Sequence, residues 1–99
     1  MEVRIQAIHF DASERLQDFI QKKVAKLEKY CDDIKKEEVS LKVVKPETAM
    51  NKEAGIKVMA MNSEFFAEKV SDTFEESVDV CCDALEKQLT KAKEKLRGK

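Results

Sequence analysis

The last third of the chain carries the strongest hydrophobic pattern in the sequence. From residue 72 to about residue 97, apolar residues recur at spacings of three and four, which places them in one stripe along an α-helix. The stripe consists of Phe74, Val78, Cys81, Cys82, Leu85, Leu89, Ala92 and Leu96. Asp72 and Glu75 have the spacing of a capping box, which supplies partners to the free amides at a helix start. The pattern predicts a long helix with one buried side.

A second helix is predicted near the N-terminus. Asp11, Ser13 and Glu14 provide capping signals, and the helix should run to about residue 30. Lys23 falls inside its apolar side, where a charged ammonium needs a partner. Lys23 either lays its aliphatic stem along the edge of the core or points into a groove that holds an anion. The apolar side itself consists of Leu16, Phe19, Ile20, Val24 and Leu27.

Four segments of alternating apolar and polar residues predict strands. They cover residues 3–10, 38–45, 54–61 and 64–70. We expect a charged turn over residues 32–38 and a tight hairpin turn at Asn62 and Ser63.

These elements predict an α+β fold in the order β-α-β-β-β-α. Its four-stranded mixed sheet has strands two to four in a meander and strand one at an edge or beside strand two. Because each helix has one apolar side, both should pack on the same face of the sheet.

Composition narrows the class of protein. Ninety-nine residues predict a single domain, 1–99, with a modest core. The formal net charge of −1 means that any contact with nucleic acid depends on local basic patches. Three cysteines do not suit a disulfide framework. The sequence shows neither a membrane-spanning run nor a signal peptide, so we expect a soluble cytoplasmic protein.

Charge is strongly polarised along the closing helix. Acids occupy its first half, and six bases occupy the last thirteen residues. Compensation of the helix dipole together with solubility explains part of this pattern, but the dipole acts only over the terminal turns. The alternative is an anion-binding end. With both helices on one face, we expect a single basic surface that places Lys22, Lys23, Lys26 and Lys29 beside Lys87, Lys91 and Lys95.

The sequence offers little for catalysis. His9 is the only histidine and has no ligand-spaced partner, and no glycine-rich phosphate loop or nucleophile motif is present. We therefore predict a binding protein and not an enzyme, with no metal and no cofactor. Phosphate neutralisation by lysines would suit RNA. A protein-protein interaction module that uses its amphipathic helices and does not bind RNA is the alternative.

Several segments resemble the ribosome hibernation-promoting factor family, also called ribosome-associated inhibitors or sigma-54 modulation proteins. The resemblance covers nearly the whole chain. Its main segments are residues 23–30 (KVAKLEKY), the Val-x-Leu-Lys pattern in residues 39–44, Ala67-Glu68 followed by Ser71-Asp72, and residues 85–95 (LEKQLTKAKEK).

This resemblance implies a fold similar to double-stranded RNA-binding domains and a ribosome-binding role. The chain would bind the small ribosomal subunit through 16S rRNA, in the mRNA/tRNA channel at the A and P sites, and repress translation as part of the stress response of stationary phase. It looks like the short form of the family, a monomer off the ribosome that would need a second factor to pair ribosomes. Members' basic contacts correspond to Lys23, Lys26, Lys87, Lys91, Lys93 and Lys95; helix geometry adds Lys22 and Lys29.

Two positions depart from the family pattern. Thr73-Phe74-Glu75 stands where many members have Asp-Met-Tyr, so the contact of that tyrosine is missing. Lys87 stands where arginine is usual, which replaces a bidentate phosphate fork by a single point charge.

Overall fold

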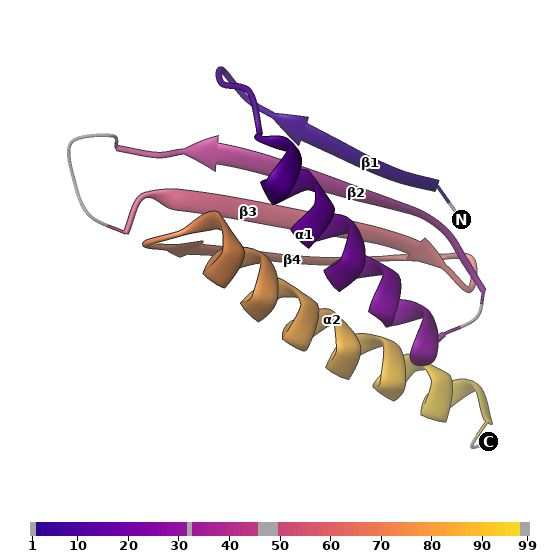
Figure 1. The fold of residues 1–99 in the computed structure, drawn as a ribbon. Coiled ribbons are helices and arrows are strands. Elements are labelled where there is room, and N and C mark those ends of the chain that lie inside the picture. The colour runs from indigo at the N-terminus through magenta and orange to yellow at the C-terminus, as the bar shows by residue number, and fades with distance from the viewer. Residues whose placement is uncertain (1, 32, 46–49, 98–99) are drawn as a thin grey trace.

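The computed structural model describes residues 2–31, 33–45 and 50–97 of the chain (Figure 1). Their elements follow the predicted order β-α-β-β-β-α, with a short 3-10 helix (η1) after the first α-helix. The elements are β1 (Glu2–Ala7), α1 (Glu14–Ala25), η1 (Lys26–Lys29), β2 (Ile34–Val43), β3 (Lys52–Ala60), β4 (Ser63–Ser71) and α2 (Phe74–Arg97).

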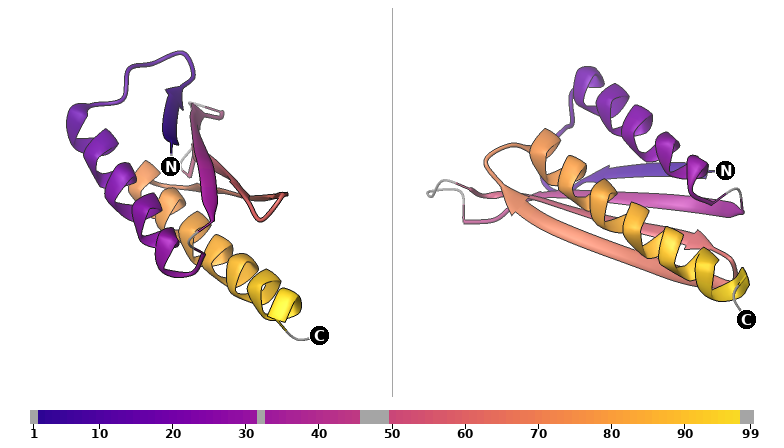
Figure 2. Two further views of the ribbon diagram at one scale, coloured as in Figure 1. Left: turned by 90° about the vertical axis from the view of Figure 1, so that its right-hand side faces the viewer. Right: turned by 90° about the horizontal axis from the view of Figure 1, so that it is seen from below.

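The four strands form one mixed sheet in the order β1-β2-β3-β4. β1 pairs with β2 in parallel, and the other two pairs are antiparallel. Both helices lie side by side on one face of this sheet and leave the other face open (Figures 1 and 2). The predicted α+β architecture is confirmed, including the position of strand one beside strand two.

The core lies between the sheet and the two helices. Alternate residues of β2 and β3 point toward the helices, as the period of two requires. Each fully buried aliphatic side chain contributes about 1.5–3 kcal/mol to the stability of the fold. Because a shift in register would expose these side chains, their burial fixes how the strands pair and how the helices lie on the sheet. The buried aliphatic residues include Ile20, Val24 and Leu27, then Val39, Leu41, Ile56 and Val58, then Val78, Leu85 and Leu89.

β1 ends three residues before the predicted boundary. His9 has a φ of 65°, a left-handed conformation that turns the chain after Ala7. The turn carries Phe10 out of the sheet and onto the ring of Phe74, with ring centroids 5.2 Å apart. This aromatic contact fastens the starts of the two helices to each other.

The charged turn predicted over residues 32–38 is wrong from Ile34 onward, because β2 already begins there; residue 32 lies outside the described part. Lys36 and Glu38 point to the open face and form an ion pair of 3.1 Å. Glu37, between them, faces the helices and is fully buried. This run of charged residues can form a strand because every second side chain lies on the open face and stays in solvent.

Single hydroxyl groups cap both helices. Ser13 Oγ accepts from the amide of Leu16 at 3.1 Å, and Thr73 Oγ1 accepts from the amide of Glu76 at 3.1 Å. The capping box predicted for Asp72 is therefore wrong. Asp72 Oδ1 instead accepts from the amide of Met50 at 3.0 Å and ties the loop before β3 to the start of α2.

The β3–β4 hairpin turns one residue earlier than predicted. Ala60 pairs with Ser63, so the two loop residues are Met61 and Asn62. Both have positive φ, 53° and 59°, which is the conformation of a type I′ turn.

Cys31, Cys81 and Cys82 are buried free thiols, and the apolar stripe of the closing helix predicts this burial for Cys81 and Cys82. Burial raises the pKa of Cys81 to about 11 and that of Cys82 to about 12, with smaller contributions from nearby charges. Because the thiolate is the reactive form, we expect an aromatic disulfide reagent at pH 8 to label the folded protein far more slowly than the urea-unfolded chain. Rapid labelling of the native protein would contradict this burial.

Candidate nucleic-acid interface

Three lysines lie on the side of the first helix that faces α2; they are Lys22 and Lys23 of α1 and Lys26, the first residue of η1. Lys22 lines a surface hollow together with Glu75 of α2, and Lys23 contacts α2 directly. Lys26 is three and four residues from them and therefore shares their side. Lys29, in η1, is exposed at the far end of the same row.

Lys23 has a partner inside the chain. Its Nζ donates to Asp79 Oδ1 of α2, and the ammonium lies 5.9 Å from the centroid of the Phe19 ring. The hydrogen bond with Asp79 raises the pKa of Lys23, against the lowering effect of partial burial. The half-buried side chain fits the interpretation in which the aliphatic stem of Lys23 follows the edge of the core. The anion beside its ammonium is a carboxylate of the chain itself.

An acidic strip on α2 faces these lysines; it consists of Glu75, Asp79, Asp83 and Glu86. A hydrogen bond with Glu86 raises the pKa of Tyr30, and the charge of Asp83 adds to that rise and to the rise at Lys23. The strip was missed at the sequence level, where these acids were taken only as one half of a polarised helix. Their spacings of four, four and three would have placed them on one side of α2.

The lysines near the end of α2 divide between two sides of the helix. Lys87, Lys91 and Lys95 are spaced by four and form one stripe. Lys95 lines a groove with Phe65 of β4, so the stripe reaches the β4 side of α2 at Lys95. Because a row of spacing four turns by about 40° per step, Lys87, four residues after Asp83, lies nearer the acidic strip. Lys93 is two residues from Lys91 and Lys95, about 200° around the axis, and lines a hollow of about 220 Å³ with Lys29, Tyr30, Thr90 and Glu94.

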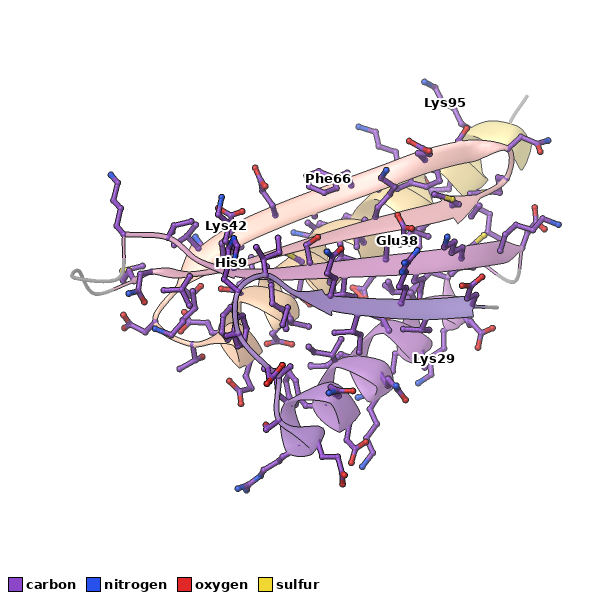
Figure 3. The ribbon with its side chains drawn as sticks, turned by 90° about the horizontal axis from the view of Figure 1, so that it is seen from above. His9, Lys29, Glu38, Lys42, Phe66 and Lys95 are labelled. Atoms are coloured by element: carbon purple, nitrogen blue, oxygen red, sulfur yellow. The ribbon has the colours of Figure 1, made fainter. Side chains whose placement is uncertain are left out.

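The predicted single surface is therefore wrong for Lys95, because this lysine lies on the β4 side of α2 and not beside the α1 lysines. Two groups exist, which we call the α1-side lysines (Lys22, Lys23, Lys26, Lys29 and Lys93) and the β4-side lysines (Lys87, Lys91 and Lys95). In Figure 3, which looks onto the open face of the sheet, Lys29 lies beyond the β1 edge and Lys95 lies beyond the β4 edge. The cause is the packing of the helices, because the side of α2 that meets α1 carries the acidic strip and Lys93.

The described residues contain no group of three or more His, Cys, Asp or Glu side chains placed to hold a metal ion. In the same part of the chain, no helix is long and apolar enough to cross a membrane. What the site offers chemically is ammonium groups on its two sides, which suits the binding of polyanions.

Residues 3–97 match the family model described as sigma 54 modulation protein / S30EA ribosomal protein. The chain belongs to this family. The matched residues include all the lysines of both groups, and the match confirms the resemblance seen in the sequence.

Two solved structures are similar to this member of the sigma 54 modulation family. A ribosomal subunit interface protein from Coxiella burnetii has a TM-score of 0.84 and 25% sequence identity, covering 94% of this chain and 98% of that one. The N-terminal domain of Thermus thermophilus Protein Y has a TM-score of 0.78 and 22% identity, covering 92% and 98%. No curated protein matches the chain in sequence.

Proposed function

We propose that this protein is a ribosome hibernation factor that binds the small ribosomal subunit through 16S rRNA. It would occupy the mRNA/tRNA channel at the A and P sites and repress translation in stationary phase. Membership of the sigma 54 modulation / S30EA family and the similarity to a ribosomal subunit interface protein support the ribosome as its partner. The observation that supports rRNA as the ligand is the presence of lysines on both sides of α2.

The division into two lysine groups suits a channel better than a flat surface. A channel has phosphates on facing walls, so a body that fills it needs bases on two sides. In this proposal the α1-side lysines contact one wall and the β4-side lysines contact the other. Each ammonium that meets a phosphate releases counterions, which provides affinity without reading base sequence. Occupation of the channel then excludes mRNA and tRNA sterically.

The ion pair between Lys23 and Asp79 gives this lysine a different role from its neighbours. Lys26, Lys29, Lys87 and Lys91 are exposed. Lys23 is half-buried and already neutralised by Asp79. We therefore assign most of the phosphate contact to the exposed lysines and assign to Lys23 the holding of α1 against α2.

Co-sedimentation with purified small subunits at rising salt tests the proposal. We expect binding at low salt that weakens roughly a thousandfold between about 50 mM and about 200 mM salt if six or more lysines contact phosphates. A protein that stays at the top of the gradient at low salt would contradict it.

The same titration separates the alternative of a protein-interaction module. Binding by an apolar surface would change little with salt. The structure disfavours the amphipathic helices for that role, because their apolar residues Ile20, Val24, Leu85 and Leu89 are fully buried in the protein's own core.

A further inference from the structure

An open groove lies between the β3–β4 turn and the last turns of α2. It has a volume of about 270 Å³ and is lined by Met61, Ser63, Phe65, Ala92 and Lys95. Three of these five side chains are apolar, and Met61 and Phe65 pack against the edge of the core without being covered. This size lies just below the roughly 300–1,000 Å³ of small-molecule sites, so it suits one flat ring.

The groove exists because α2 carries only a small side chain where it passes Phe65. Leu89 is fully buried, but the next inward-facing position of α2, one turn later, is Ala92. A methyl group cannot reach across to the ring of Phe65, and the apolar surface there stays accessible.

One of the β4-side lysines, Lys95, borders this groove. Lys95 is part of its lining and is exposed, and Lys91 and Lys87 continue the same stripe along α2 at spacings of four. Figure 3 shows Lys95 extending beyond β4. An occupant that combines a flat apolar ring with a nearby negative charge would match the apolar groove and the lysine beside it.

We propose that this groove holds a single unpaired nucleobase of rRNA, stacked on Phe65 and Met61, with its phosphate at Lys95 and Lys91. Unstacked bases bind aromatic side chains through their π-faces, and the flanking phosphate supplies the charge that the lysines neutralise. Ser63 also lines the groove, and its hydroxyl would hydrogen-bond the edge of the base. The inference rests on the proposed function and adds to it a base contact that lysines alone do not provide.

Filling the groove tests the inference without removing any core contact. Ala92→Leu replaces one strong helix former by another and places a larger side chain over Phe65. We expect its affinity for purified small subunits to fall roughly tenfold to a hundredfold, the equivalent of one stacked base. In chemical probing of 16S rRNA, one base protected by the wild-type protein should become reactive again, while the protection of the backbone persists.

Ala84→Leu is the matched control, because it makes the same change in the same helix outside the groove; its affinity should equal that of the wild type. Circular dichroism checks that both variants fold. An Ala92→Leu protein with wild-type affinity and footprint overturns the nucleobase and leaves the ribosomal function standing. A loss of affinity without any newly reactive base also overturns it, since a side chain of a ribosomal protein would then fill the groove. Failure of the wild type to bind at all overturns the proposed function as well.

Discussion

Charge reversal at Lys26, Lys29, Lys87 and Lys91 is expected to abolish binding to the small subunit while leaving the protein folded. All four side chains are exposed. Each glutamate would remove one phosphate contact and add a repulsion, so roughly 1 kcal/mol at each position lowers the affinity about a thousandfold in total. Lys23 is left unchanged, because its replacement would leave Asp79 without its ion-pair partner and disturb the contact between α1 and α2.

Paired variants sharpen this test. Lys26→Glu with Lys29→Glu alters the α1-side lysines, and Lys87→Glu with Lys91→Glu alters the β4-side lysines. Lys35→Glu with Lys42→Glu changes the net charge equally in the exposed part of β2 and serves as the control. If both sides contact rRNA, each of the first two doubles weakens binding and the control does not. Equal weakening by all three would show that only overall charge matters.

Replacing Glu37 by leucine is expected to stabilise the protein by about 3 kcal/mol at pH 8. The Glu37 side chain is fully buried, and neither of its carboxylate oxygens has a hydrogen-bond partner among the described residues. Burial, with a smaller contribution from Glu28, raises the pKa of Glu37 from its ordinary 4.5 to about 7. That difference is worth about 3 kcal/mol at roughly 1.4 kcal/mol per pKa unit. Leucine has a similar volume and needs no hydrogen-bond partner. It would lie between Val3 and Val58, which pair with position 37 on the neighbouring strands.

The pH dependence of stability has a definite sign. Below about pH 4.5 Glu37 is protonated in both states and carries no ionisation cost. Between about pH 4.5 and 7 the unfolded chain ionises while the folded protein keeps the proton, so stability falls as pH rises. Above about pH 7 the full cost is present. The advantage of Glu37→Leu over the wild type should therefore shrink from pH 8 to pH 5.

Urea unfolding followed by circular dichroism at these two pH values measures the effect. Glu38→Leu is the matched control, because Glu38 lies next in β2 on the open face. An ion pair with Lys36 lowers its pKa, so this substitution should bring no gain. A Glu37→Leu protein less stable than the wild type at pH 8 would show that the buried carboxylate has a partner in solution.

The fold could be predicted from the sequence where the hydrophobic period was unambiguous. The stripe through Val78, Leu85 and Leu89 and the alternation of Ile56 and Val58 each permit one orientation, and the structure has both. The start of β2 could not be predicted in this way. Charged residues at 35–38 are typical of turns, and only pairing with β1 and β3 makes them a strand.

The positions of the lysines along the helices follow from the sequence, but their arrangement around α2 does not. The lysines of both helices are where helical periodicity puts them. Which side of α2 meets α1, however, depends on how the two helices pack on the sheet, and the ion pair between Lys23 and Asp79 shows that it is the acidic side. The groove beside Lys95 was also invisible in the sequence, because it depends on Ala92 lying over Phe65.

The acidic strip between the two lysine groups has a consequence for how the protein searches for its target. With a formal net charge of −1, the molecule exerts almost no long-range pull on a polyanion. A loose strand of messenger or a bare duplex offers phosphates to one side at a time and meets carboxylates next to the ammonium groups. Under the proposed function, abundant cellular RNA would therefore be a poor competitor, and tight association would be reserved for a cavity that presents two walls at the right separation.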